Sequence, residues 1–248
     1  AAIHAIDPAE VPGLERVDPL RRLRGGLDLL DVHRPAFELG MRWLEDHRPD
    51  PRDDRVVHGD FRVGNLLVDD EGLQAVLDWE LTHLGDPMED LGWFCVRAWR
   101  FGGAGVAGGI GSVDELVDAY AAAGGVPVDA ETVRWWTVLG TITWGLICAV
   151  QARRHLDGGV RSVELATIGR RVCETEYDVL DLLAESGAHP APSAPPAASE
   201  PLAPIARPGI HGRPDASELV EAVREHLVDR VAPQLSGSAA FHLKVAAN

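Results

Sequence analysis

Hydrophobic residues along this chain fall mostly at the spacing of helices. Residues 27–47 carry apolar side chains three or four positions apart, and Pro35 marks a break or a helix start among them. The same spacing predicts further helices over residues 87–101, 112–122, 130–154 and 163–183. We therefore expect a mostly α fold.

One short segment has the pattern of a β-hairpin. Residues 66–68 form an apolar run, residues 69–72 a turn that ends in glycine, and residues 73–77 a return strand. If Leu67 faces Val76 across this hairpin, Asn65 faces Asp78. Directly opposed residues lie about 4.5–5.5 Å apart on one face, so these two oxygen-bearing side chains could share a hard cation such as Mg²⁺.

The segments on either side of this hairpin carry the candidate chemistry. Residues 58–65 read His-Gly-Asp-Phe-Arg-Val-Gly-Asn, and residues 77–80 read Leu-Asp-Trp-Glu. The spacing H-x-D-x-x-x-x-N is typical of phosphoryl-transfer sites. It places Asp60 where a carboxylate can accept a hydroxyl proton, and Asn65 and Asp78 where they can bind the metal that carries the phosphates of ATP.

A third block, residues 85–93, reads Gly-Asp-Pro-Met-Glu-Asp-Leu-Gly-Trp. Asp86 followed by proline and then Glu89 is a helix start, so we interpret Asp86 as a cap and structural support. Asp90 lies in the first turn of this helix, where its charge suits the helix dipole. Glu80, just after the second block, is either a further group around the metal or a surface charge.

These three blocks, in this order, resemble the aminoglycoside phosphotransferase family, which has a protein-kinase-like fold and includes choline-kinase-like enzymes. The chain looks most like bacterial phosphotransferase family proteins and the kinase domains fused to some acyl-CoA dehydrogenases. The resemblance covers residues 1–183 and implies the helical C-terminal lobe of that fold.

The resemblance also implies roles for individual residues. Asp60 matches the catalytic aspartate, Asn65 and Asp78 the Mg²⁺ ligands, and His58 a residue that holds the catalytic loop. Asp90 stands near the position where this fold carries an acidic residue that braces the catalytic loop, so we interpret it as structural support. Arg62 stands where many protein kinases carry a lysine that touches the transferred phosphate, so we count it with the catalytic residues. A solvated or salt-bridged arginine is the equally weighted alternative.

Lysine usage bears on nucleotide binding. The sole lysine is Lys244, and no glycine-rich loop precedes His58, although kinase-like enzymes use both to hold the phosphates. We therefore expect the nucleotide (N-terminal) lobe to be absent, with a separate nucleotide-binding lobe as a candidate partner. Residues 103–108 spell G-x-G-x-x-G but follow a predicted helix instead of a strand, which argues against a dinucleotide site and for a mobile loop near the mouth of the active site.

Composition limits the partners and the compartment. A formal net charge of −16 argues against nucleic-acid binding and makes a metal ion necessary for binding an anionic nucleotide. The cysteines Cys95, Cys148 and Cys173 have no paired spacing and are interpreted as buried thiols in a reducing compartment. The apolar stretch 136–150 is too short and too polar for a membrane span, and no signal peptide is visible, so we expect a cytoplasmic protein without a membrane partner.

The pattern changes after residue 186. Residues 187–214 are rich in Pro, Ala and Ser and predict a linker, and residues 215–248 predict a helix capped by Asp215 and the start of a second helix near Ser238. The expected domains are thus a phosphotransferase lobe over residues 1–186, a linker, and the truncated start of a small helical domain.

The functional hypothesis is an ATP- and Mg²⁺-dependent phosphotransferase that moves the γ-phosphoryl group to a hydroxyl of a small-molecule acceptor. The alternative is a non-catalytic remnant, or a binding subunit of a split phosphotransferase. An acyl-CoA-linked role is a third, weaker option. The acceptor is left open among aminoglycosides, hydroxyacyl-CoA, choline-like alcohols and macrolides.

Overall fold

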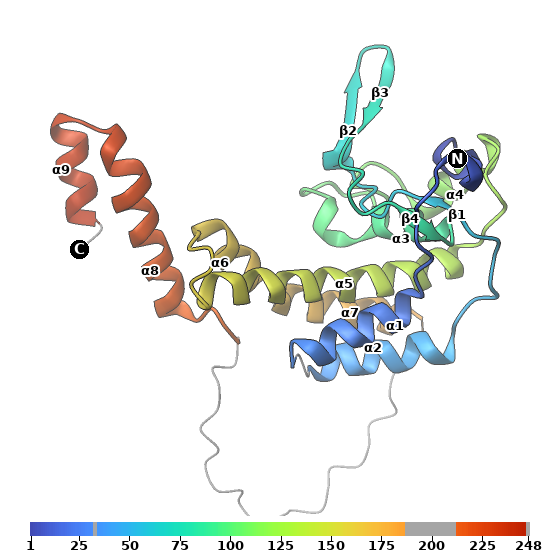
Figure 1. Cartoon of the computed structure of the whole chain (residues 1–248), viewed down its shortest axis with the longest axis horizontal. Helices are drawn as coiled ribbons and strands as arrows, with labels where there is room; N and C mark the ends of the chain where they lie inside the picture. The colour runs from blue at the N-terminus through green and yellow to red at the C-terminus, as the bar shows by residue number, and fades with distance from the viewer. Residues whose placement is uncertain (32–33, 187–211, 247–248) are drawn as a thin grey trace, which may run out of the picture. The chain divides into compact units, whose positions relative to one another are not determined.

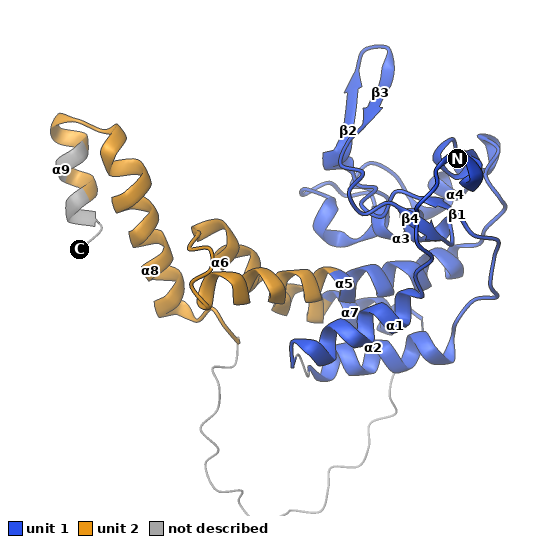
Figure 2. Cartoon of the chain, in the orientation of Figure 1, with its two compact units in different colours: residues 1–143, 178–188 blue, residues 144–177, 189–248 orange. Residues whose placement is uncertain are grey.

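The computed structural model describes residues 1–31, 34–186 and 212–246. It divides into two compact units, Ala1–Thr143 with Asp178–Ala188 (unit 1) and Trp144–Tyr177 with His189–Asn248 (unit 2), coloured separately in Figure 2. Most of the predicted linker lies outside the described residues. The predicted domain boundaries stay a prediction.

After two short 3₁₀ turns, Ile3–Ala5 and Pro8–Glu10, the first α-helices of unit 1 are α1 (Pro19–Leu29) and α2 (Pro35–Asp46). The apolar spacing predicted α2 and the role of Pro35, but it missed most of α1. The side chain of Asp18 accepts a hydrogen bond from the backbone N–H of Arg21, and Pro19 occupies the first turn. This aspartate–proline pair is a helix-start signal of the same kind as the one recognised at Asp86.

Helix α5 (Ala130–Leu156) is the long helix predicted near this position. Its 27 residues make it, by length and composition, a candidate membrane span among the described residues, so the expectation that this stretch is too short and too polar was wrong. Within its most apolar window, 61% of the residues are buried inside the protein, as in the core helix of a soluble protein. The buried hydroxyls of Thr137 and Thr141 each donate to the carbonyl one turn earlier, so both are satisfied within the helix.

Two separate antiparallel sheets of two strands each accompany the helices (Figure 1). Strand β1 (Arg55–Val57) pairs with β4 (His83–Gly85), and β2 (Leu66–Asp69) pairs with β3 (Gly72–Val76) in the hairpin. Strand β4 was not predicted, because three residues are too few to show alternation. Its pairing with β1 brings the two ends of the segment 58–82 together, and this segment contains the candidate site.

The register predicted for the hairpin was wrong by one residue. Leu67 pairs with Ala75, and Leu66 pairs with Val76. Asn65 therefore lies opposite Leu77, whose N–H donates to the carbonyl of Asn65 at 2.8 Å, and not opposite Asp78. A bulge between Leu67 and Val68 shifts the pairing again near the turn. Because of this bulge, counting residues outward from the turn does not give the register at Asn65.

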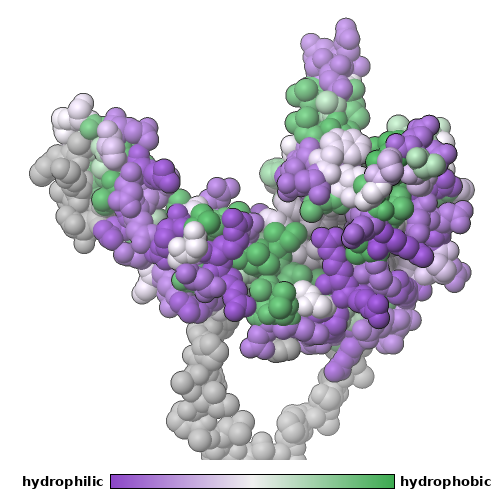
Figure 3. All heavy atoms as spheres, in the orientation of Figure 1, coloured by the Kyte–Doolittle hydropathy of each residue, from purple (hydrophilic) through white to green (hydrophobic). Residues whose placement is uncertain are grey.

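Apolar side chains are exposed on the hairpin. Leu67, Val68 and Leu73 are 54%, 64% and 56% exposed, and Figure 3 shows this hydrophobic surface below a hydrophilic turn. The hairpin side chains therefore contribute little to the core of unit 1.

Helix α3 (Met88–Cys95) ends earlier than the predicted residue 101. Val96 adopts φ −57° and ψ 131°, and a 3₁₀ turn over Arg97–Trp99 follows. This break lets the ring of Trp99 lie 5.4 Å from that of Trp93 on the preceding helix. The sequence pattern could not show it, because the apolar spacing continues through the break.

The glycine-rich segment 102–111 is anchored to the core at two residues, although half of its residues are exposed. Ala107 and Gly108 are buried, and the N–H of Gly108 donates to the carbonyl of Phe94 at 3.0 Å. Ala107 joins a core cluster with Phe94, Cys95 and Val133. The preceding element is a 3₁₀ turn, so the segment lacks the strand–loop–helix context of a dinucleotide site. The predicted helix after it is confirmed as α4 (Val113–Ala122), with the capping box of Ser112 and Glu115.

Unit 2 contains the second half of α5, the helix α6, the first residues of α7 and the helices of the tail. The single helix predicted over 163–183 is instead two, α6 (Val163–Arg170) and α7 (Val172–Glu185), separated at Arg171. The tail forms α8 (Ala216–His226), capped by Asp215 as predicted, and α9 (Gly237–Ala246), joined by short π and 3₁₀ turns over Leu227–Gln234. Helix α8 packs on α6, and Arg161 forms an ion pair with Glu225 at 2.7 Å.

Candidate active site

The carboxylate of Asp60 is the centre of the candidate site. It lies on the loop between β1 and the 3₁₀ turn Val63–Asn65. Three side chains donate to it: Nε1 of Trp93 to Oδ1 at 2.8 Å, Nδ2 of Asn65 to Oδ2 at 2.8 Å, and Nε of Arg62 to both oxygens at 3.1–3.2 Å. Asn65 also donates to the backbone carbonyl of Asp60 at 2.9 Å. Together these contacts fix both the side chain and the backbone of Asp60.

His58 is fully buried and holds the loop from inside. Its Nδ1 lies 3.2 Å from the backbone N–H of Asp60, and its Nε2 lies 3.0 Å from the carbonyl of Leu77. The first contact requires an acceptor and the second a donor, so the geometry fits a neutral ring protonated at Nε2. His58 thus ties the loop that carries Asp60 to the end of the hairpin that precedes Asp78.

Asp90 braces the same loop from α3. Its carboxylate, 2% exposed, accepts from the backbone N–H groups of His58 and Gly59, each at 2.9 Å. Its Oδ2 also lies 3.0 Å from Nε2 of His4, whose Nδ1 lies 2.8 Å from the hydroxyl of Tyr120. Burial, and then the charges of Asp86 and Asp90, raise the pKa of Tyr120 to about 12. This network makes the contacts expected of a bracing role for Asp90.

Arg62 is salt-bridged to Asp60, which matches the plainer of its two interpretations. Its guanidinium also lies over the ring of Trp99, 5.0 Å from the centroid. Gly64 leaves room for this arrangement, because a Cβ there would meet Nη1 of Arg62 at 2.4 Å. A contact between Arg62 and a transferred phosphate stays a prediction.

Asn65 and Asp78, the predicted metal ligands, both keep oxygens available. Asn65 uses its amide nitrogen for Asp60, and its Oδ1 meets no hydrogen-bond donor among the described residues. The exposed carboxylate of Asp78 likewise has no hydrogen-bond or ion-pair partner in the described part of the chain. Its backbone adopts φ 69°, a left-handed conformation that is uncommon for aspartate. An amide oxygen and a carboxylate on adjoining segments suit Mg²⁺, which prefers oxygen ligands and keeps several positions for phosphate and water.

Asp86 makes no hydrogen bond or ion pair with Asp60 in the described part of the chain. Its Oδ1 accepts from the backbone N–H of Met88 at 2.9 Å, so it caps α3 although the helix starts one residue later than predicted. Burial raises the pKa of Asp86, despite this hydrogen bond and the nearby charge of Arg52. Its contacts are those of a structural residue.

Three residues of the site were not predicted from the sequence: Trp93, His4 and Tyr120. Trp93 stood in the third motif block but carried no signal of a hydrogen bond to a residue 33 positions away. His4 is 86 residues from Asp90. Only the folded chain brings these pairs together.

Cys95 and Cys148 are buried as predicted, whereas Cys173 is only partly buried, so the prediction was wrong for that residue. Burial raises the pKa of Cys95 and of Cys148 to about 12, so neither is a thiolate near neutral pH.

Among the described residues, no group of three or more His, Cys, Asp or Glu side chains is arranged to hold a metal.

Comparison with known proteins agrees with this geometry. Residues 1–136, more than half of the chain, match the model of the phosphotransferase enzyme family. Acyl-CoA dehydrogenase family member 10 of Mus musculus is 45% identical over 64 residues, which are 25% of this chain and 6% of that protein. Acyl-CoA dehydrogenase family member 11 of Homo sapiens is 32% identical over 103 residues, 37% of this chain and 13% of that protein.

A solved structure shares the fold. It is a Ralstonia eutropha protein named provisionally as an aminoglycoside phosphotransferase, with 23% identity, a TM-score of 0.61, and coverage of 74% of this chain and 62% of that one. The chain therefore spans less than two thirds of the length of each of these proteins. Its mostly helical structure with small two-stranded sheets matches part of the kinase-like fold of aminoglycoside phosphotransferases. The chain belongs to the phosphotransferase enzyme family.

Proposed function

We propose that this chain carries the catalytic loop of a small-molecule kinase, which transfers the γ-phosphoryl group of ATP to a hydroxyl of its acceptor. One observation supports the proposal most directly: the side-chain amide of Asn65 donates to Asp60 at 2.8–2.9 Å. The backbone of the same loop is held by hydrogen bonds to the carboxylate of Asp90. In phosphoryl transfer most of the rate comes from positioning and electrostatics, and this loop is built for positioning.

Each side chain has a definite part in the proposed step. The acceptor oxygen forms a bond to the γ-phosphorus, the bond to the ADP oxygen breaks, and the hydroxyl proton passes to Asp60. Asn65 and Asp78 would hold Mg²⁺, which supplies positive charge to the phosphates when bound. Arg62, in contact with Asp60, places a second positive charge beside the path of the phosphoryl group.

The acceptor is the open part of the proposal. Relatives bear names of acyl-CoA dehydrogenases, and the similar solved structure bears the name of an aminoglycoside phosphotransferase. A hydroxyacyl-CoA and an aminoglycoside are therefore the first two acceptors to test. Choline-like alcohols and macrolides complete the panel.

A second candidate function follows from lysine usage. Residues 1–243 contain no lysine, although kinase-like enzymes hold the α- and β-phosphates with one. In this alternative the chain is a binding subunit that acts only with a separate nucleotide-binding lobe. The exposed apolar side chains Leu67, Val68 and Leu73 on the hairpin fit contact with a partner protein.

One assay tests both functions. The chain is incubated with ATP, Mg²⁺ and each acceptor, and ADP release is measured. We expect Asp60→Asn to lower turnover by about 10²–10⁴-fold, as for loss of a general base, while Asp70→Asn in the exposed hairpin turn leaves it unchanged. Turnover that survives Asp60→Asn would refute the catalytic assignment.

Nucleotide binding gives a readout that does not need turnover. We expect calorimetry to show Mg²⁺-dependent binding of ATP that Asp78→Asn weakens and Asp70→Asn does not. A chain that neither binds nor turns over ATP alone, but does so when mixed with a nucleotide-binding lobe, would establish the binding-subunit alternative. Equal nucleotide affinity in the Asp78→Asn variant and the wild type would remove Asp78 from the site.

A further inference from the structure

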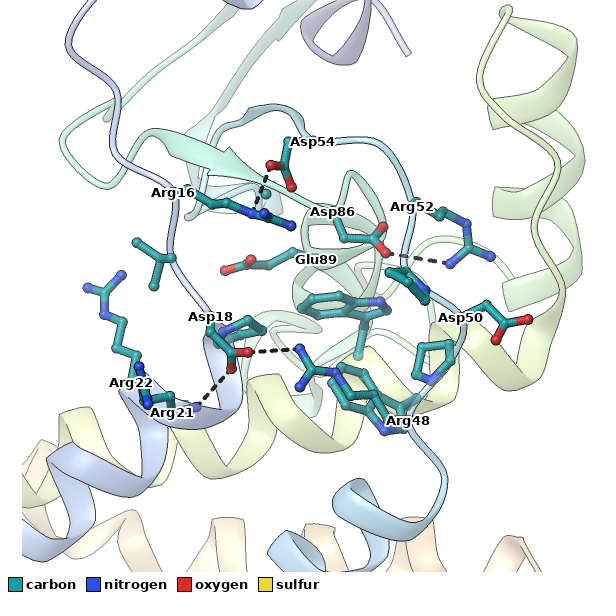
Figure 4. Close-up of a pocket in the computed structure, with 17 residues that line it drawn as sticks. Arg16, Asp18, Arg21, Arg22, Arg48, Asp50, Arg52, Asp54, Asp86 and Glu89 are labelled. Atoms are coloured by element: carbon teal, nitrogen blue, oxygen red, sulfur yellow. Dashed lines mark hydrogen bonds and ion pairs between the residues drawn. The ribbon is translucent and has the colours of Figure 1, made fainter.

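A cavity that Asp60 does not line lies within unit 1. Its volume is about 640 Å³, and it is lined by the segment before α1, the segment between α2 and β1, the start of α3, and α5 (Figure 4). None of Asp60, Asn65 and Asp78 lines it. Its size is that of a pocket for a small organic ligand.

Two buried donors in the lining of this cavity have no acceptor among the described residues. Trp136 is 4% exposed, and its Nε1 has no hydrogen-bond partner, whereas its neighbour Trp135 donates to the carbonyl of Leu44 at 2.9 Å. Nη1 of Arg52 is also buried without a hydrogen bond. Its ion-pair partner, Oδ2 of Asp86, is 3.6 Å away, too far for a hydrogen bond. Buried donors are usually satisfied, so this pair indicates a place for an acceptor.

The other charges of the cavity favour an anion at Arg52. Arg16 pairs with Asp54 at 2.8 Å and Arg48 with Asp18 at 3.0 Å, as the dashed lines in Figure 4 mark. These two guanidinium groups are therefore already neutralised. The exposed Arg21 and Arg22 have no carboxylate partner among the described residues, and the exposed Asp50 has no cationic one.

Glu89 is a further carboxylate in the lining of the cavity. Glu89 contacts Nε2 of His83 at 3.1 Å. Arg52, whose side chain is 25% exposed, is the least exposed arginine of the lining, and its contact with Asp86 is long at 3.6 Å.

We propose that this cavity binds a small organic anion, a carboxylate or a phosphate monoester with a flat apolar body. Both donor atoms are closed off from solvent in the unliganded protein, so the two side chains would shift for Nη1 of Arg52 and Nε1 of Trp136 to donate to the anionic group. The body packs against Pro49, Pro51 and the tryptophans that line the cavity. Arg52 would turn from Asp86 toward the ligand, so the Asp86 carboxylate competes with the anion. This site is independent of the phosphotransferase function proposed for Asp60.

Calorimetric titration of the whole chain with phenyl phosphate tests the site. We expect saturable binding that Arg52→Gln weakens by about tenfold, the loss of one charge-assisted contact, and that Trp136→Phe weakens by about threefold or more, because only the N–H is removed. Arg48→Gln is the matched control: it changes the charge of the cavity equally but removes a guanidinium already paired with Asp18, so the affinity stays within about twofold. Asp60→Asn leaves binding unchanged, which separates this site from the catalytic loop.

Asp86→Asn is expected to raise the affinity for phenyl phosphate, whereas the Arg52 and Trp136 variants lower it. Asparagine still caps α3 but no longer competes for Arg52, so phenyl phosphate binds more tightly than to the wild type. Benzoate and inorganic phosphate, titrated in parallel, show whether the site takes a carboxylate and whether it needs the apolar body. Absence of saturable binding for both aromatic anions would overturn the proposal. So would equal losses in Arg52→Gln and Arg48→Gln, or binding abolished by Asp60→Asn. If Trp136→Phe does not fold, the Arg52 and Asp86 variants decide.

Discussion

The indole N–H of Trp93 donates a hydrogen bond to Oδ1 of Asp60 over 2.8 Å. The ring of Trp93 is 6% exposed and lies against Trp99, so the donor is held by its own packing. Arg62 and Asn65 hold the same carboxylate from the loop, but Trp93 holds it from α3. The rigid helix therefore fixes the orientation of the proposed proton acceptor.

Trp93→Phe tests this positioning. The substitution keeps most of the buried ring and removes the N–H, so we expect kcat of the phosphotransferase reaction to fall by about tenfold, equivalent to about 1.4 kcal/mol, with little change in KM. Trp79→Phe is the matched control, since Nε1 of Trp79 donates only to the carbonyl of Val76. A parallel fall in both variants would show that the hydrogen bond to Asp60 has no special role.

Asp90→Asn should destabilise the fold. The carboxylate of Asp90 accepts from two backbone N–H groups and contacts His4, and an amide can replace only part of this set. We expect the free energy of unfolding in urea to drop by about 3 kcal/mol, the scale for removing one partner of a buried charged network. Asp114→Asn, on the exposed first turn of α4, should change it by less than about 0.5 kcal/mol. A loss below about 1 kcal/mol at Asp90 would contradict the bracing role.

The pair of His83 and Glu89 predicts a pH dependence of stability. Nδ1 of His83 faces the carbonyl of Leu81 at 2.8 Å, and Nε2 faces the Glu89 carboxylate at 3.1 Å. Burial lowers the pKa of His83, but the hydrogen bond and charge of Glu89 outweigh it, and the net pKa lies above the ordinary 6.5. The charged imidazole therefore stabilises the folded state fully below pH 6.5, and this contribution is lost as the pH rises through the raised pKa.

Glu89→Gln should show this window. We expect the variant to lose about 1 kcal/mol of unfolding free energy near pH 5.5–6 and progressively less at higher pH. Denaturant unfolding across this range is the measurement, with Glu71→Gln in the exposed hairpin turn as the charge-matched control. A deficit that grows with pH would mean that the sign of the pKa shift is wrong.

Two helical glycines should respond to alanine with opposite signs. Gly25 in α1 has no atom within 4 Å of an added Cβ, so Gly25→Ala should stabilise the protein by about 0.5–1 kcal/mol through helix propensity. At Gly92 in α3 an added Cβ would meet Cβ of Trp136 at 2.3 Å and backbone atoms at 2.5 and 2.8 Å. Gly92→Ala should therefore destabilise by about 1–3 kcal/mol, because overpacking outweighs propensity. Thermal unfolding of both variants checks this, and a stabilised Gly92→Ala would refute the close approach of α3 and α5.

The amino-acid sequence by itself determined the family, the mostly helical class and the positions of the motif residues. Local rules were sufficient there, since the capping boxes at Ser112 and Asp215 and the apolar spacing of α5 depend on near neighbours. The same local rules could not give the register of the hairpin, where a bulge breaks the alternation after Leu67.

Tertiary structure decided the contacts that set the site. The hydrogen bond from Trp93 to Asp60 and the contact between His4 and Asp90 join residues 33 and 86 positions apart. The break at Val96 and the unsatisfied donors of Arg52 and Trp136 likewise depend on how distant segments pack. A sequence pattern records periodicity along one element, whereas these features depend on the distances between elements, which only the folded chain fixes.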